Sequence, residues 1–187
     1  MHWGAGGLSD VTVLFADLRG FTTLIHQRGP EVVRPLVDEF FRRCSDIVVN
    51  HDGIVDHFLG DAVMAFFNVP ILHDDHIAQA IAAATEIQLA MPGINTAAGE
   101  EDLLKVGIGI DTGFAATGAL GSNDCRDYTV MGDNVNIASR LQGEAAPGEI
   151  LVTEQVYEKV GSAFPNAQER VLELKGIKEP VRAFSLT

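Results

Sequence analysis

The chain has 187 residues, of which 47% are apolar, and it carries a formal net charge of -13. A chain of this length and apolar content is able to bury the core of one domain without disulfide or metal staples. The excess of acid argues against nucleic acid as a partner, because 13 Lys and Arg residues cannot easily supply the basic patch that phosphate contacts need.

Membrane and redox signals in the sequence are weak. No uninterrupted apolar run approaches the roughly 18 residues that a membrane helix needs, and Met1–Asp10 lacks the charged and apolar regions of a signal peptide. Cys44 and Cys125 form no spaced metal or redox motif, which is typical of a reducing compartment. We therefore expect a cytoplasmic chain with no membrane segment.

The first nine residues are rich in glycine, which is typical of the end of a linker. We expect residues 1–9 to be the remnant of a linker and residues 10–187 to be one folded domain. A linker at this end also predicts that further domains lie upstream.

The first informative stretch is an apolar, β-branched run that ends on a carboxylate. Val11–Ala16 predicts a strand that delivers Asp17 to its end, and Gly20 allows the following turn to approach a ligand closely. The amides of Phe21 and Thr22 would then face outward at a helix start. This arrangement predicts a metal ligand beside a phosphate cradle, although such units also occur in α/β proteins with structural roles only.

A second carboxylate follows one helix later. The apolar spacing in Glu31–Asn50 predicts an amphipathic helix, and Gly53–Leu59 with Ala62–Phe67 predicts a hairpin that has Asp61 at its tip. Two aspartates at adjacent strand ends make a metal site. Hard oxygen ligands suit Mg²⁺ or Mn²⁺, whose remaining positions would be filled by water and substrate phosphates.

The middle of the chain predicts further helices and strands. Asp75–Met91 predicts an alanine-rich helix, and Pro92–Asp102 predicts a polar loop. Lys105–Thr112 alternates and continues into Gly113–Leu120 as a strand pair.

The remaining elements complete a mixed α and β pattern. A strand at Tyr128–Met131 leads into a helix at Asn134–Gln142, on which Asn136 and Arg140 lie four residues apart on one face. An amide and a guanidinium so placed are able to address the same ligand, and a surface salt-bridge helix is the alternative. The chain ends as strand, helix, strand and strand at Ile150–Thr153, Glu154–Val160, Val171–Leu174 and Val181–Leu186. Without strict alternation, these elements predict an antiparallel or mixed sheet backed by helices on one face.

Three motifs taken together resemble the class III nucleotidyl cyclase catalytic domain. They are Phe15–Thr22 (FADLRGFT), Leu59–Phe66 (LGDAVMAF) and Tyr128–Leu141 (YTVMGDNVNIASRL). The resemblance covers about residues 10–187 and implies an α+β fold with a ferredoxin-like βαββαβ core and added strands and helices. It also implies a head-to-tail homodimer, in which each of two interface sites makes a cyclic nucleotide and pyrophosphate from a nucleoside triphosphate.

The resemblance assigns roles to ten residues of this chain. The two metal ions, Mg²⁺ or Mn²⁺, would be held by Asp17, Asp61 and the carbonyl of Leu18, while Phe21 and Thr22 supply the amides over the phosphates. The other subunit would supply Asn136, which orients the ribose, and Arg140, which stabilises the transition state. Lys175 would bind the triphosphate, with Lys178 as a nearby alternative, and His57 and Thr129 would form the base-selecting pair. In-line attack on the α-phosphorus needs positioning and charge stabilisation but no protein nucleophile.

The sequence departs from the family pattern at the base-selecting pair. Adenylate cyclases of this family usually carry a lysine at the position of His57, and a neutral imidazole is able to donate to adenine N1 or to accept from guanine N1–H. We expect an adenylate cyclase with an upstream regulatory domain. The alternatives are a guanylate or dual-specificity cyclase, a cyclase-like module that binds nucleotide without turnover, and an unrelated ferredoxin-like binding domain.

Overall fold

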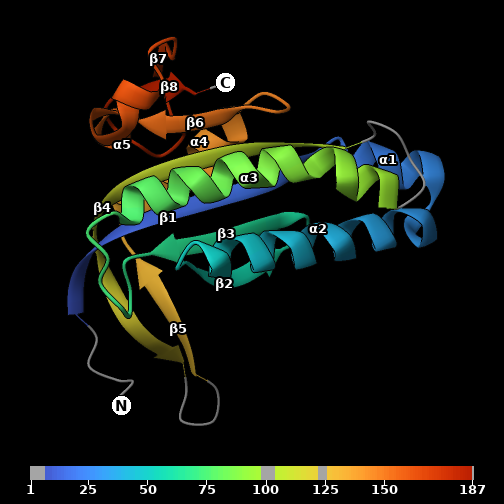
Figure 1. Ribbon diagram of the computed structural model, residues 1–187, viewed down its shortest axis with the longest axis horizontal. Helices are drawn as coiled ribbons and strands as arrows, with labels where there is room; N and C mark the ends of the chain where they lie inside the picture. Colours follow the sequence, from blue (N-terminus) through green and yellow to red (C-terminus); the bar gives the residue numbers. More distant parts are fainter. Residues whose placement is uncertain (1–6, 98–103, 122–125, 187) are drawn as a thin grey trace.

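The computed structural model describes residues 7–97, 104–121 and 126–186. Figure 1 shows long helices packed along a twisted sheet. In chain order the elements are β1 (Gly7–Arg19), α1 (Phe21–Arg28), α2 (Pro30–Asn50), β2 (Ile54–Leu59), β3 (Ala62–Phe67), α3 (His76–Ala97), β4 (Lys105–Gly121), β5 (Arg126–Met131), α4 (Asp133–Glu144), β6 (Ile150–Thr153), α5 (Glu154–Val160), the 3-10 helix η1 (Gly161–Ala163), β7 (Gln168–Leu172) and β8 (Val181–Ser185).

The sheet has the strand order β2-β3-β1-β4-β6-β8-β7, and β5 pairs with β4 off this path. β4 and β6 are parallel, and every other described pair is antiparallel. The first four strands with their intervening helices follow the βαββαβ order, so the predicted ferredoxin-like core with added elements is confirmed.

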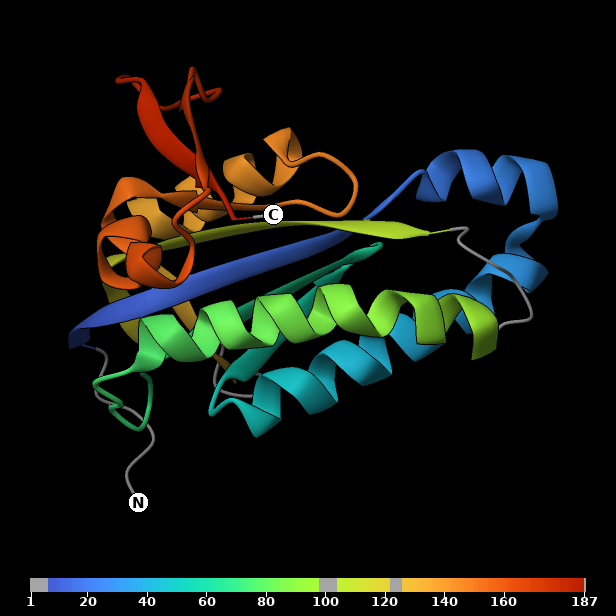
Figure 2. The same ribbon diagram turned by 45° about the horizontal axis from the view of Figure 1, so that its top comes forward.

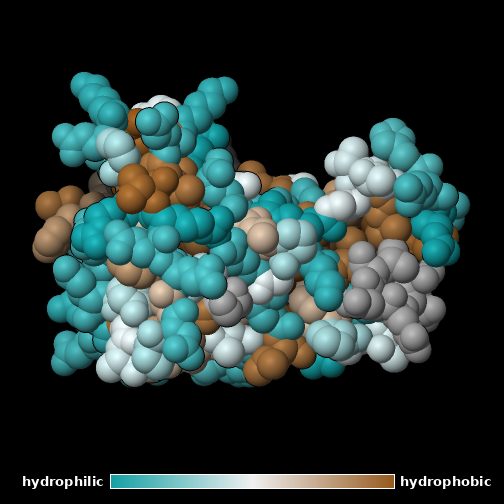
Figure 3. Space-filling view, turned by 90° about the horizontal axis from the view of Figure 1, so that it is seen from above, coloured by the Kyte–Doolittle hydropathy of each residue, from teal (hydrophilic) through white to brown (hydrophobic). Residues whose placement is uncertain are grey.

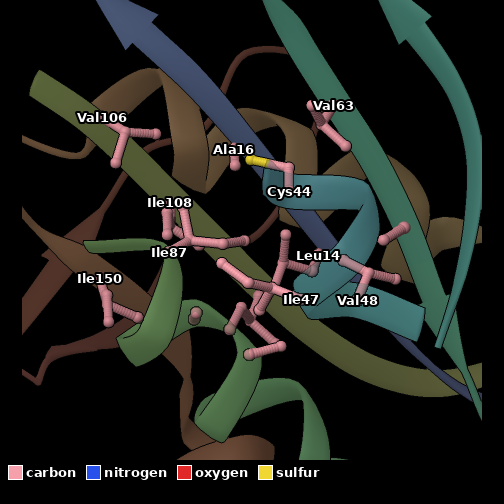
Figure 4. Close-up of a cluster of buried hydrophobic side chains, with 14 of the residues drawn as sticks. Leu14, Ala16, Cys44, Ile47, Val48, Val63, Ile87, Val106, Ile108 and Ile150 are labelled. Carbon is pink, nitrogen blue, oxygen red and sulfur yellow. The ribbon is translucent and has the colours of Figure 1, made fainter. Parts of the chain in front are cut away.

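Helices cover both faces of this sheet, which corrects the prediction of helices on one face. Alternate residues of β1 point to opposite sides because the side-chain period of a strand is two. Leu14 and Ala16 join a core formed with α2 and α3, and Figure 4 shows Cys44, Ile47 and Ile87 converging on them. On the other side, Val13 and Phe15 of β1 pack in a cluster with Ala138 of α4. Figure 2 shows α4 across the sheet from α3.

A glycine in β4 allows α4 to lie directly on the sheet. A Cβ atom at Gly109 would fall on the Ala138 carbonyl oxygen and the Gln142 amide nitrogen, and within 2.8 Å of the Gln142 Cα. Only a residue without a side chain fits at this crossing, and the helix that carries Asn136 and Arg140 is therefore held close to the strands.

Several predicted boundaries are wrong, among them that of the strand predicted at Val171–Leu174, which is β7 at Gln168–Leu172. Lys105–Gly121 is one continuous strand and not a strand pair, because β1 pairs with it through thirteen consecutive positions. The predicted loop after Met91 is helical up to Ala97, since Asn95 on this extension is buried and exchanges two hydrogen bonds with the backbone of Leu104. The strand β1 begins at Gly7, within the predicted linker, while residues 1–6 lie outside the described residues.

Two surface features bear on possible partners. The end of β4 and β5 form a two-stranded arm that extends away from the helical layers in Figure 1. The face that Figure 3 shows, seen from the side of β7 and β8, is largely hydrophilic with separate hydrophobic patches. Within the described residues, we find no helix with the length and hydropathy that crossing a bilayer requires.

The close crossing at Gly109 predicts that even one added methyl group destabilises the fold. Gly109→Ala should reduce the free energy of unfolding by about 1–3 kcal/mol, because the overpacked strand forces α4 outward. The control is Gly143→Ala on α4 itself, where a Cβ would meet no atom within 4 Å and alanine favours the helix. Urea unfolding of both variants measures the effect, and equal stabilities would contradict the close packing.

Candidate active site

The two predicted metal aspartates come together at one end of the β1–β3 ladder. Asp17 pairs in register with Ala62, and the Leu18 amide donates to the Asp61 carbonyl oxygen at 3.3 Å. Gly60 turns the hairpin with a φ of 65°, a left-handed conformation that favours glycine. Burial, and after it the negative charge of Asp61, raise the pKa of Asp17 to about 6. The backbone thus holds two carboxyl groups together that repel one another when both are ionised.

Two side chains that the sequence did not single out support Asp17. The Arg19 guanidinium pairs with Asp17 Oδ2 at 3.3 Å, and Gln142 Nε2 donates to the same oxygen at 2.9 Å. Both contacts oppose the rise in the Asp17 pKa. Arg19 also donates to the Gln142 carbonyl oxygen, and its guanidinium occupies the space that a side chain at Gly107 would need. Its buried Nε atom has no hydrogen-bond partner among the described residues, which leave Arg19 an incompletely satisfied cation beside an acidic pair.

The predicted phosphate cradle lies at the start of α1. Gly20 precedes this helix in a left-handed conformation with a φ of 76°, and no side chain of the described residues caps the helix. Phe21 is half-buried against the core, while Thr22 is exposed. The first amides of α1 therefore begin four residues after Asp17, next to the acidic pair along the chain, as the sequence predicts.

The predicted base-selecting pair is brought together by a third residue. His57 is exposed on β2 and Thr129 is half-buried on β5. Both make a hydrogen bond to Asp56, whose side chain is 3% exposed. The two residues therefore share one buried carboxylate, although they come from strands that are not neighbours in the sheet.

Asn136, Arg140 and Lys175 lie on exposed surface. Asn136 and Arg140 are on α4, whose inner face is fixed by Asn134, because the Asn134 amide donates to the backbone oxygens of Val11 and Gly113. Lys175 lies in the loop between β7 and β8, which is anchored by buried Leu174. Among the described residues, no hydrogen bond or ion pair joins these three side chains to Asp17 or Asp61 of the same chain.

A comparison with known families identifies the chain. The sequence model of the adenylate and guanylate cyclase catalytic domain matches residues 5–187. The chain belongs to this family. The predicted resemblance is thus confirmed.

Individual relatives agree on the cyclase family but differ in their nucleotide. Adenylate cyclase 1 of Rhizobium meliloti (strain 1021) is 36% identical over 146 residues, which are 76% of this chain and 22% of that protein. The guanylyl cyclase Cya2 superposes with a TM-score of 0.90 at 31% identity, covering 97% of this chain and 93% of that one. The adenylyl cyclase CyaB of P. aeruginosa superposes with a TM-score of 0.88 at 28% identity, covering 97% and 95%.

This cyclase domain spans between 22% and 31% of the length of the curated relatives that it matches first. Sequence reasoning missed Arg19, Gln142 and Asp56 as parts of the site. Gln142 follows Arg140 by two residues and Asp56 directly precedes His57, so only proximity in the chain could have drawn attention to them.

The raised pKa of Asp17 predicts that its ionised carboxylate lowers the folding stability of the metal-free cyclase domain, and that this effect depends on pH. The folded state holds the Asp17 proton up to about pH 6, whereas the unfolded chain releases it near the ordinary value of 3.8, so stability is lost as the pH rises from about 4 to about 6. Asp17→Asn should therefore melt above the wild type in EDTA at pH 7.5, by roughly 3 °C for each 1 kcal/mol. The difference should shrink as the pH falls toward 4.

The matched control is Asp38→Asn, which removes an exposed carboxylate that also pairs with one arginine, Arg34. Mn²⁺ should raise the melting temperature of the wild type and of the control, but not that of Asp17→Asn, because a ligand stabilises only the state that binds it. An Asp17→Asn variant that melts below the wild type in EDTA, or that Mn²⁺ stabilises equally, would contradict this account of the acidic pair.

Proposed function

We propose that residues 10–187 are an adenylate cyclase domain that converts ATP to 3′,5′-cyclic AMP and pyrophosphate. The observation that carries the proposal is the pairing of Asp17 with Asp61 at the end of β1, on a fold of the cyclase family. The sequence relative named adenylate cyclase 1 supports ATP as the substrate.

The acidic pair suits two Mg²⁺ or Mn²⁺ ions. Asp17 and Asp61 offer hard carboxylate oxygens, and the carbonyl of Leu18 adds a neutral oxygen ligand. Within the described residues, no group of three or more His, Cys, Asp or Glu side chains is placed to hold a metal ion. A carboxylate pair is nevertheless the usual Mg²⁺ arrangement, in which water and substrate phosphates complete the coordination. Bound ions would lower the pKa of the ribose 3′ hydroxyl and neutralise the leaving pyrophosphate.

The residues of the chain position the nucleotide around this pair. The amides of Phe21 and Thr22 bind the phosphates at the start of α1, where the helix dipole favours an anion. Arg140 stabilises the charge that develops on the α-phosphoryl group, and Asn136 orients the ribose. Lys175 neutralises the triphosphate. Each of these acts by charge or position, and no side chain attacks the substrate.

A head-to-tail homodimer would bring these residues to the acidic pair. Asn136, Arg140 and Lys175 are exposed, as expected of residues that serve a site on another subunit. The hairpin and β5 also expose large apolar side chains, with Phe58 46% exposed and Met131 56% exposed, which a partner subunit would cover. Two-fold symmetry then gives two equivalent sites for each dimer.

A guanylate cyclase is the second candidate, because His57 stands where adenylate cyclases of the family usually carry lysine. An imidazole nitrogen is able to accept from guanine N1–H as well as to donate to adenine N1. The superposition with the guanylyl cyclase Cya2 keeps this candidate open. Separate assays with ATP and GTP distinguish the two.

The proposal predicts that Asp61→Asn abolishes turnover. Loss of one metal carboxylate should reduce cyclic AMP formation from ATP, with Mn²⁺ present, by about a thousandfold or more. Asp61 lies at a hairpin turn outside the core, and the variant should therefore keep the far-UV circular dichroism of the wild type. Asp38→Asn again serves as the control and should retain full activity. A folded Asp61→Asn protein with wild-type turnover would refute the metal site.

A further inference from the structure

Asp56 occupies an irregular position in β2. The ladder with β3 pairs Val55 with Ala65 and then His57 with Met64, so that Asp56 sits in a bulge between two paired residues. A bulge redirects a side chain that regular alternation would send to the other face of the sheet. Here it aims a carboxylate inward, and the Asp56 side chain is 3% exposed.

One oxygen of this carboxylate accepts two hydrogen bonds. Thr129 Oγ1 donates to Asp56 Oδ2 at 3.0 Å, and His57 Nδ1 lies 2.6 Å from the same atom. An ionised carboxylate has no hydrogen to give, so that His57 Nδ1 must also be the donor. The contact leaves Nε2 as the ring nitrogen of His57 that is available to a ligand.

This bond determines what Thr129 offers to a nucleotide. A hydroxyl group has one hydrogen and two lone pairs, and it normally rotates to suit its neighbour. The hydrogen of Thr129 is directed to Asp56, and its oxygen therefore presents only lone pairs to any other group. Thr129 is in this way restricted to accepting hydrogen bonds.

Adenine and guanine differ at the atom that such an acceptor would meet. Adenine carries an amino group at C6, which donates, whereas guanine carries a carbonyl oxygen there, which accepts. An oxygen that only accepts hydrogen bonds therefore pairs with the adenine amino group and repels the guanine carbonyl oxygen. Two acceptors that face one another in the bound complex leave a hydrogen bond unmade, and this costs enough free energy to discriminate between ligands.

We propose that Asp56 is a specificity-determining residue that acts through Thr129 and selects adenine over guanine. It is a positioning residue, because it contacts the base-selecting pair and not the nucleotide. The inference rests on the proposed function in that Thr129 faces the base. It adds to that function a reason why a site with histidine in place of lysine prefers ATP.

The test measures equilibrium binding, so that it does not depend on turnover. Isothermal titration with the α,β-methylene analogues of ATP and GTP, which cannot be cyclised, gives two dissociation constants and their ratio. The wild type should bind the ATP analogue at least about tenfold more tightly than the GTP analogue. Asp56→Ala frees the Thr129 hydroxyl to donate, and it should reduce this preference by about tenfold, the effect of one lost hydrogen bond.

Further variants separate positioning from a general structural role. In Asp56→Asn the amide oxygen is able to take the place of Oδ2 and accept both bonds, and this variant should keep the preference. Thr129→Val should lose the preference, and adding Asp56→Ala to it should change the ratio no further. The control is Asp111→Ala, which removes another buried carboxylate that accepts a threonine hydroxyl, from Thr153 at 2.5 Å. It should lower stability without moving the ratio.

The outcomes distinguish this inference from the proposed function. An Asp56→Ala protein with the wild-type ratio, or with both affinities reduced equally, would overturn the role of Asp56. Tighter wild-type binding of the GTP analogue would overturn it as well, while leaving cyclase chemistry intact. A wild type that forms no cyclic product but binds the ATP analogue selectively, with the selectivity lost in Asp56→Ala, would instead overturn the proposed enzyme activity and uphold the inference.

Discussion

The antiparallel pairing of β1 with β3 is the constraint on which the acidic pair of the candidate site, Asp17 and Asp61, depends. It places Asp17 opposite Ala62, and the turn that follows β2 then has no position for Asp61 except beside Asp17. The ladder is buried on both faces by apolar side chains, so the two carboxylates cannot separate without disrupting the core. Burial, together with the repulsion from Asp61, keeps the pKa of Asp17 raised. A stable sheet thus maintains a local arrangement that is unfavourable until a cation binds.

The helix α4 contacts this acidic pair and also carries Asn136 and Arg140, two further residues of the candidate site. Gly109 in β4 allows the helix to lie on the sheet, where Gln142 reaches Asp17 on the inner side while Asn136 and Arg140 remain exposed. In a head-to-tail dimer, the same helix would therefore contact the metal ligands of one site and supply the catalytic side chains of the other. A shift of α4 that moves Asn136 and Arg140 in one site would therefore also change the hydrogen bond from Gln142 to Asp17 in the other site.

Most of the fold follows from local patterns in the sequence. The limits of β6 and α5 are those predicted, because short apolar runs and clear polar breaks define them. The pattern fails where long-range packing decides. Pro92 suggests the end of a helix, yet burial of Ile94 and Asn95 extends α3 beyond it. The stretch Lys105–Gly121 was predicted as a strand pair, but it is one strand in which Gly109 lies under α4 and Gly107 leaves room for Arg19.

In the site too, local sequence patterns predict some features and long-range packing decides the others. The aspartates were predictable, because each ends an apolar strand and belongs to a motif. The supporting contacts were not, since Gln142 and Asp17 lie 125 residues apart in sequence, and Thr129 and Asp56 lie 73 apart. Alternation along β2 predicts that Asp56 and His57 point to opposite faces, and only the bulge brings both to one place. Side-chain contacts that depend on a bulge or on a helix crossing cannot be read from periodicity.

Mixing two inactive variants tests the central claim, that each site is built from two subunits, most directly. Asp17→Ala and Asn136→Ala should each be inactive as homodimers, while their heterodimer has one site with both lesions and one with neither. After free exchange at equal amounts, cyclic AMP formation should recover to roughly a quarter of the wild-type rate, because half the dimers are mixed and half of their sites are intact. No recovery, with subunit exchange demonstrated by differently tagged chains, would mean that the acidic pair and α4 do not meet across a dimer.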